Sequence, residues 1–428
     1  MNQTEIDNLN ITKITIWLDK HNITQYSIRK ENMDFYVDVH DSVNLSDSKI
    51  SHIPFKFGVI DNDFCIDNNL LTSCESLPQI VKKDFSIHNN KIENFEKSNI
   101  KEIFGIAVMS SNQINDLENI PIVHSYLNLN HNKLTSLKHL PECISGTLSV
   151  SKNLLTNLDY LPLLIKGDFV CAFNKVSSFS DLQKTTILGS LIMEYNNLIN
   201  CINIPKVYNS IDLSHNFITT LQGLNHQTLD SLNLNFNQLT SLEFCPNTIK
   251  TSLLVNYNQL KNFSHIGENM NEIYVQHNQI NSFLGLEKTN FSLLFANNNK
   301  IKSFKHLPHL VKGHLCLEEN LIKSFYASPK VIKGDLIVSN NKISSLKNVP
   351  DTIHGDLIVS HNPLTTVDHL PSQMTGYFIA SFPNFLNSDI EAYSLKEIEK
   401  VKIYHDMQKE SQLQNNEENQ IKNKKIKL

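Results

Sequence analysis

The sequence has 428 residues, and its 38 lysines and arginines against 43 aspartates and glutamates give a formal net charge of −5 and a pI of about 6.4. This balance creates no broad basic field, so we expect no nucleic-acid partner. No run of roughly 18 apolar residues is present and the first residues lack the apolar core of a signal peptide, so we expect neither a membrane span nor classical export.

Residues 1–42 read as an N-terminal cap made of a helix and a hairpin. Thr12 is a suitable N-cap, and Ile14, Trp17 and Leu18 share one face of the helix that would follow it. Residues 26–28 and 35–39 then alternate like two strands around a turn at residues 30–32. We expect this segment, with the only tryptophan of the chain, to cover the core of the domain that follows.

An internal repeat occupies most of the chain. An asparagine returns every 20 to 22 residues, each time in the frame apolar–any–apolar–any–any–Asn–any–apolar. A fixed period of this length indicates a solenoid of stacked coils. The asparagines in register are Asn69, Asn90, Asn112, Asn132, Asn153, Asn174, Asn196, Asn216, Asn237, Asn258, Asn278, Asn299, Asn320, Asn341 and Asn362.

One unit shows why asparagine suits its position. Leu336 and Val338 alternate as in a short strand with one buried face, Asn341 follows, and Ile343 returns to the core. Asparagine carries both donors and an acceptor on one side chain. It can therefore pair backbone groups where the strand turns away, each of which would cost roughly 1–3 kcal/mol if buried unpaired.

Prolines and glycines keep the same phase as the asparagines. Proline resists a helix interior and glycine permits a tight turn, so the return half of each unit is predicted to be extended or irregular, with a tight turn into each strand. The glycines in phase are Gly105, Gly146, Gly167, Gly189, Gly313, Gly334, Gly355 and Gly376. The prolines are Pro78, Pro121, Pro141, Pro162, Pro205, Pro246, Pro308, Pro329, Pro350 and Pro371.

The repeat resembles that of leucine-rich repeat proteins, in the short form of bacterial effectors and phage-associated proteins. The pattern LPxxIxGDLxVSxNxLxSL is carried by Leu140, Pro141, Ile144, Gly146, Leu148, Val150, Asn153, Leu155 and Leu158. The resemblance implies an α/β-type repeat solenoid, the leucine-rich repeat horseshoe, with a parallel sheet on its concave face. It covers residues 43–385, about 17 units, with Ser48 and Pro383 replacing asparagine at the two ends.

Two segments follow the repeats. Residues 386–412 are predicted to contain a C-terminal helix, beginning near Ser394, with Leu395, Ile398 and Val401 on one side. Residues 413–428 are polar and form a predicted disordered basic tail. Its lysines are Lys422, Lys424, Lys425 and Lys427, and we expect them to be solvated.

Catalytic and metal-binding constellations are weak in this sequence. The repeat frame separates His306 and His309 on the return half from His314 and Cys316 on the strand, so we predict no metal site. Residues 65–67, Cys-Ile-Asp, have the form used by ubiquitin ligases that some bacterial repeat effectors carry, but here they lie on a repeat strand and no large helical domain follows. The seven cysteines include no CxxC pair, and Cys74, Cys171 and Cys201 fall in apolar positions of the frame, where we expect reduced core residues. We therefore expect no cofactor and no enzyme activity.

A strip of rings is the candidate binding surface. The residue before the asparagine is aromatic or histidine in six consecutive units, and five coil-to-coil steps would extend the strip about 25 Å. These residues are Phe173, Tyr195, His215, Phe236, Tyr257 and His277, joined on the strand by Ile192, Leu254, Tyr274 and Phe295. Such a strip is typical of a protein interface. A ladder that only stiffens the sheet is the alternative.

Three functions remain open on sequence grounds. The first is a non-catalytic protein-binding module that uses its concave face, in a role such as a bacterial effector or phage-encoded host-interaction protein. The second is a structural or assembly component attached through its caps or tail. The third is a substrate-recruiting adaptor of a ubiquitin-ligase-like enzyme. We expect a monomer that binds another protein, in the cytoplasm or secreted into a host cell without a classical signal peptide.

Overall fold

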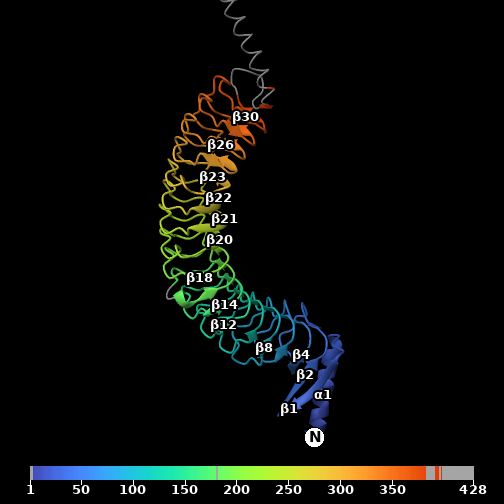
Figure 1. Cartoon of the computed structure of the whole chain (residues 1–428). Helices are drawn as coiled ribbons and strands as arrows, with labels where there is room; N and C mark the ends of the chain where they lie inside the picture. Colours follow the sequence, from blue (N-terminus) through green and yellow to red (C-terminus); the bar gives the residue numbers. More distant parts are fainter. Residues whose placement is uncertain (1–2, 180–181, 382–390, 395–396, 398–428) are drawn as a thin grey trace, which may run out of the picture. The chain divides into compact units, whose positions relative to one another are not determined.

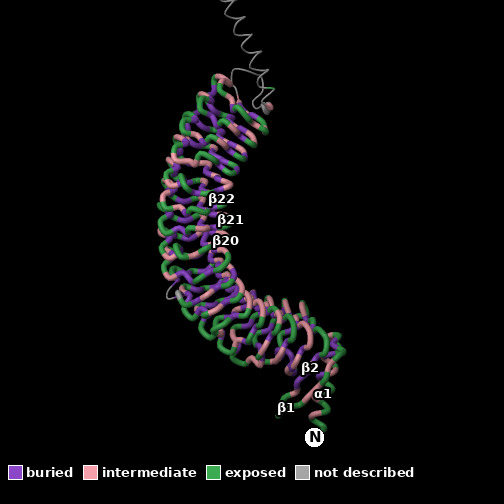
Figure 2. The backbone as a smooth tube through the Cα atoms, viewed as in Figure 1, coloured by how far each residue is buried: buried purple, intermediate pink, exposed green. Residues whose placement is uncertain are grey.

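A computed structural model of the chain describes residues 3–179, 182–381, 391–394 and 397. The chain forms two units, Met1–Gln238 and Leu239–Leu428, and each is described separately. Both are parallel β-solenoids of the leucine-rich repeat kind, which confirms the predicted fold class. Each coil contributes one short strand to a ladder, and buried residues alternate with exposed ones along every coil (Figure 2).

The main ladder of the first unit runs through the strands that the repeat predicts. Successive coils stack one on the next (Figure 1). Their strands pair in parallel and in register, so Leu127 lies beside Leu148 and Leu148 beside Phe169. The strands are β3 (Val43–Asn44), β5 (Phe64–Cys65), β7 (Phe85–Ser86), β9 (Ala107–Val108), β11 (Leu127–Asn128), β13 (Leu148–Ser149), β15 (Phe169–Val170), β17 (Leu191–Ile192), β19 (Ile211–Asp212) and β20 (Leu229–Asn233).

The return half of the coils is more regular than the prolines and glycines suggested, because it adds further short parallel strands. One sheet has the order β1-β2-β4-β6-β8-β10, in which β1 (Tyr26–Glu31) and β2 (Asp34–Val39) form the N-terminal hairpin, and a second has the order β12-β14-β16-β18. Beyond the two hairpin strands, they comprise β4 (Lys56–Ile60), β6 (Ile80–Val81), β8 (Glu102–Ile103), β10 (Ile122–Val123), β12 (Cys143–Ile144), β14 (Leu164–Ile165), β16 (Thr186–Ile187) and β18 (Lys206–Val207). A 3-10 turn, Leu182–Lys184, precedes β16.

The second unit repeats this plan. Its main ladder ends in an antiparallel pair between β31 and β32. The strands of this ladder are β21 (Thr248–Leu254), β22 (Asn269–Tyr274), β23 (Leu293–Phe295), β25 (His314–Cys316), β27 (Leu336–Ile337), β29 (Leu357–Ile358), β31 (Phe378–Ala380) and β32 (Glu391–Tyr393). A further sheet contains β24 (Leu310–Val311), β26 (Val331–Ile332), β28 (Thr352–Ile353) and β30 (Gln373–Met374).

Strand β32 lies within the range that the sequence assigns to the C-terminal helix, 386–412. Apart from Glu391–Ser394 and Glu397, that range lies outside the described residues, as do Pro383 and the basic tail 413–428. The predicted helix and tail therefore remain predictions.

The N-terminal cap contains the expected helix and hairpin, with different boundaries. Helix α1 (Gln3–Lys20) begins nine residues before Thr12, whose hydroxyl donates to the Asn8 carbonyl at 2.8 Å instead of capping the helix. Strands β1 (Tyr26–Glu31) and β2 (Asp34–Val39) are longer than predicted and turn at residues 32–33. Trp17 packs edge-to-face on Phe55 of the first coil, with ring centroids 5.1 Å apart, so it belongs to the cap.

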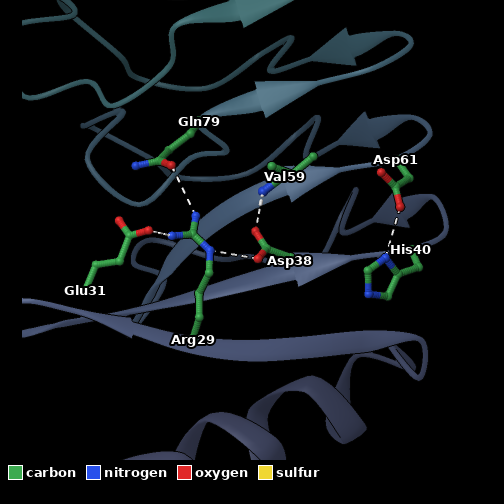
Figure 3. A network of polar contacts seen from close by, with 7 residues as sticks. All are labelled: Arg29, Glu31, Asp38, His40, Val59, Asp61 and Gln79. Atoms are coloured by element: carbon green, nitrogen blue, oxygen red, sulfur yellow. Dashed lines mark hydrogen bonds and ion pairs between the residues drawn. The ribbon is translucent and has the colours of Figure 1, made fainter.

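Polar contacts attach the hairpin to the first coil (Figure 3). Arg29, the only arginine of the chain, donates through Nε to Asp38 at 2.7 Å and also pairs with Glu31 and Gln79. The other Asp38 oxygen accepts the Val59 N–H at 2.7 Å. Because this carboxylate on β2 binds Arg29 on β1 and Val59 on β4, it fixes the register between the cap and the solenoid.

The in-phase glycines are explained by close packing of coils and not by left-handed turns. The left-handed glycines of the described chain are Gly223 and Gly285, which do not belong to the in-phase set. At Gly334, an added Cβ would lie 2.6 Å from the carbonyl carbon of Gly313 in the preceding coil. A side chain there would force adjacent coils apart, so the close spacing of the coils requires glycine at this position.

Candidate functional site

The repeat asparagines join each coil to the one before it. Asn196 is 4% exposed, and its amide donates to the Cys171 carbonyl of the preceding coil at 2.8 Å and to the Met193 carbonyl of its own coil at 3.3 Å. Its oxygen accepts the Val176 N–H of the preceding coil at 3.0 Å. All fifteen repeat asparagines are buried, with exposed fractions of 4 to 8%. They are structural side chains and not surface ligands.

The direction of these bonds accounts for the first degenerate unit. Each asparagine serves the coil before it, so an asparagine in the opening coil would have no earlier coil to serve. Ser48 occupies the position there, and its hydroxyl donates to the Ser46 carbonyl at 3.2 Å. The Ile50 N–H of this coil donates to the side-chain oxygen of Asn69 in the next coil at 2.7 Å.

The ring residues lie in a bend after the strand, which corrects their predicted place on the strand itself. Every residue before a repeat asparagine has a left-handed backbone, with φ between 52° and 56°. This conformation costs roughly 1–2 kcal/mol for most residues; glycine adopts it most easily, and asparagine, aspartate and histidine adopt it more often than other residues. Outside the strip, asparagine occupies this position at Asn68, Asn89, Asn298 and Asn340, and other small or polar residues occupy it at Ser111, His131, Lys152, Glu319 and His361.

In the first unit, four of the six rings form one stack, which we call the ring ladder: Phe173, Tyr195, His215 and Phe236. Successive ring centroids are 4.4, 4.1 and 4.3 Å apart, and the planes are within 9° to 12° of parallel. The Lys152 ammonium lies over the outer face of Phe173, 5.5 Å from its centroid. Because ring faces are covered by neighbours, the ladder presents ring edges to solvent.

The exposed fraction of these rings is substantial. Phe173, Tyr195 and Phe236 are 43%, 42% and 43% exposed, whereas the strand side chains on the core side are buried. Phe217, two residues after His215, is 49% exposed and adds apolar area beside the ladder. Sequence reasoning missed Phe217 because its position in the frame is mostly occupied by lysine, leucine or glutamine in the other units.

In the second unit, Tyr257 and His277 occupy the same bend and stack at 4.3 Å. On the strands, Tyr274 stacks on Phe295 at 5.3 Å, and its hydroxyl donates to Glu272 at 3.1 Å. Ile192 in the first unit and Leu254 in the second are half-buried on their strands. The predicted site residues thus form one stack in the first unit and two ring pairs in the second.

Polar side chains lie beside the ring ladder on the same strands. Asp212 accepts hydrogen bonds from the Ser214 N–H at 2.9 Å and the Asn233 amide at 2.8 Å. Burial raises the pKa of the neighbouring Glu194 carboxyl, the Asp212 charge raises it further, and His215 opposes the shift. Sequence reasoning overlooked this pair because no motif marks it.

The chemical constellations considered from the sequence do not assemble into a site. His306 pairs with Glu287 at 2.6 Å and His314 with Asp335 at 2.9 Å, while His309 is exposed and Cys316 is buried. Within the described residues, no three histidine, cysteine or carboxylate side chains gather as metal ligands.

Five of the seven cysteines are buried in the core, Cys65 is half-buried and Cys143 is exposed. All seven cysteines are free. Burial raises the pKa of Cys65, whose sulfur lies 3.1 Å from the Ser46 hydroxyl. Burial raises the pKa of Cys74, Cys201 and Cys245 to about 12. These thiols are therefore protonated and poorly nucleophilic at neutral pH.

The helices described here include none with the length and apolar character needed to cross a membrane. No protein-family model matches the sequence, and no curated protein sequence matches it.

Several solved structures resemble the fold. YopM of Yersinia enterocolitica is 20% identical, with a TM-score of 0.40 over 78% of this chain and 91% of that chain. YopM of Yersinia pestis, described as a leucine-rich effector protein, is 19% identical, with a TM-score of 0.47 over 78% and 88%. The functional domain of InlJ from Listeria monocytogenes is 18% identical, with a TM-score of 0.43 over 64% and 63%. The leucine-rich repeat fold of this chain rests on its own repeat register and strand pairing.

Proposed function

We propose that this chain is a non-catalytic protein-binding module and that the ring ladder is the centre of its binding surface. Solenoids of this class present extended surfaces that commonly bind other proteins. Exposed aromatic side chains contribute disproportionately to protein interfaces. An effector-like or host-interaction role, with a protein partner, is part of this proposal.

The observation that carries the proposal is the choice of residue at the left-handed bend. Asparagine fits this backbone at little cost and also links coils, as in the 2.9 Å bond from the Asn89 amide to the Asn68 side-chain oxygen. Each ring instead incurs roughly 1–2 kcal/mol of backbone strain. Stacking contributes about 0.5–1.5 kcal/mol per pair beyond burial, which offsets that strain at best. Stability alone therefore gives no reason to prefer the rings, whereas binding does.

The test replaces rings with asparagine, which tolerates the left-handed backbone of the bend. We expect Tyr195→Asn with Phe236→Asn to weaken a captured protein partner by about tenfold or more, since hot-spot side chains contribute about 2 kcal/mol. The melting temperature should change little, because asparagine relieves the strain at both bends. Partner affinity would be measured by biolayer interferometry with the full chain immobilised.

A matched control uses Tyr160→Asn with Phe244→Asn. These rings are also exposed and left-handed, with φ of 65° and 67°, but they lie at the return corner of their coils. Equal losses of affinity in the two double variants would refute the proposed binding surface. Partner capture that requires residues 386–428 and ignores the rings would favour attachment through the C-terminal segment instead.

A further inference from the structure

The strand side chains beside the ring ladder carry negative charge and no lysine or arginine. In the four coils that bear the ladder, the outward strand and bend positions hold the carboxylates Asp168, Glu194 and Asp212, and strand β20 adds Asp230. The whole chain has 38 lysines and arginines against 43 acidic residues, so an even mixture would be expected on an indifferent surface. The other outward positions are Val170, Ala172, Ser190, Ile192, Ser210, Ser214, Ser231, Asn233 and Asn235.

Asp168 and Asp212 already accept hydrogen bonds within the solenoid. Asp168 accepts the Ser190 N–H of the next coil at 2.7 Å, and Asp212 accepts bonds from Ser214 and Asn233. Glu194 is different, because within the described residues its carboxylate has no hydrogen-bond or ion-pair partner. It stands between Tyr195 on its own coil and Asp212 on the next, where a second negative charge repels it.

A cation is the group that this surface lacks. At the end of the ladder the chain supplies one itself, since the Lys152 ammonium lies over Phe173. Beside Glu194 and Asp212 the outward positions of the ladder coils offer no such group. A cationic side chain there would pair with two carboxylates while its methylene stem packed on the ring edges. Phosphate-bearing partners, by contrast, would meet like charge.

We propose, on the basis of the proposed function, that the partner presents a lysine- or arginine-bearing polypeptide segment to the ring ladder. Its cation contacts Glu194 and Asp212, and its apolar groups contact Tyr195, His215 and Phe217. Charge complementarity then selects basic segments, and the ring edges provide the apolar contact area.

The experiment uses the full chain and three labelled peptides of equal length and tyrosine content that carry lysine, glutamine or glutamate at every third position. Fluorescence anisotropy should show the tightest binding for the lysine peptide, with affinity falling as salt is added. Glu194→Gln should weaken that peptide about two- to fivefold, the range of an exposed ion pair, and Glu194→Lys should weaken it further.

Glu93→Gln is the matched control, because Glu93 is exposed on the return half of a coil and its replacement changes net charge equally. Lysine-peptide binding no tighter than glutamine-peptide binding, or equal effects of Glu194→Gln and Glu93→Gln, would overturn the proposal. Ring variants that weaken the protein partner while Glu194 variants do not would refute the charge inference and leave the proposed function standing. If neither the ring variants nor the Glu194 variants weaken binding, both the charge inference and the proposed function are refuted.

A stability measurement separates binding from a structural role for Glu194. A raised carboxyl pKa means that the protonated form favours folding, and that this contribution is lost as the pH rises through the folded-state pKa. At neutral pH, Glu194→Gln should therefore melt at or above the wild-type temperature, and the difference should vanish below about pH 4, where the carboxyl is protonated in both states. A lower melting temperature for the variant at neutral pH would instead indicate a structural carboxylate and contradict the proposal.

Discussion

Replacing one repeat asparagine tests whether the buried amide ladder holds the coils together. In Asn196→Ala, the Val176 N–H and the Cys171 carbonyl lose their partner on the next coil, and two carbonyls of the Asn196 coil lose a donor. Val176 and Cys171 are both 0% exposed, so water cannot replace the amide without opening the stack. The Val176 N–H is left unpaired, whereas the Cys171 carbonyl keeps a long bond of 3.4 Å from the Asn174 amide. One buried group left unpaired predicts a loss of about 1–3 kcal/mol in the free energy of unfolding.

The loss would be measured by urea denaturation of the full chain, followed by circular dichroism. For a unit of about 200 residues, each kcal/mol lowers the melting temperature by roughly 2–4 °C, so the midpoint of thermal scans should fall by about 2 °C or more. Asn197→Ala is the neighbouring control, because the Asn197 side chain is exposed and its backbone N–H donates independently to the Val176 carbonyl at 2.8 Å. That variant should stay within about 0.5 kcal/mol of wild type. If Asn196→Ala and Asn197→Ala lower the free energy of unfolding equally, the buried asparagine side chains do not hold the coils together.

Two further predictions concern the cap and the thiols. Gly58→Ala places a Cβ against the Asp38 carboxylate and should lower the stability of the cap by about 1–3 kcal/mol. The loss would be measured by Trp17 fluorescence during urea denaturation. The same change in an Asp38→Ala background should cost less, because the clashing carboxylate is gone. With a thiol reagent at mildly alkaline pH, exposed Cys143 should react in the native chain, whereas Cys74, Cys201 and Cys245 should react only after unfolding. Rapid native labelling of the buried thiols would show that the coils open far more readily than their packing implies.

The cap illustrates the limit of local signals. Thr12 has the residue type of an N-cap, yet the helix begins at Gln3 because the polar residues before Thr12 are also compatible with helix. The buried residues of α1, Ile14 and Leu18, were identifiable from their spacing. Where a helix extends beyond the surface it covers, as over the exposed first turns of α1, no apolar pattern marks its start.

The ring strip shows a similar division. Its members were identifiable because they keep phase with the asparagines, but their left-handed bend was not, since aromatic residues rarely adopt that backbone. Likewise, the in-phase glycines suggested turns, whereas contact between successive coils requires them. Glu194 carries no local signal, because its neighbour Asp212 lies 18 residues away and only stacking brings the two charges together.

The sequence by itself determined the period, the core positions, the asparagine ladder and the fold class, because each depends on a pattern that repeats along one chain. The tertiary structure alone decided what successive coils do to one another. Backbone contact, ring stacking, the pairing of each asparagine with the preceding coil and the repulsion between Glu194 and Asp212 all depend on distances across the stack. A period shows which residues are equivalent, but the separation and direction of neighbouring coils are set only when the backbone hydrogen bonds form.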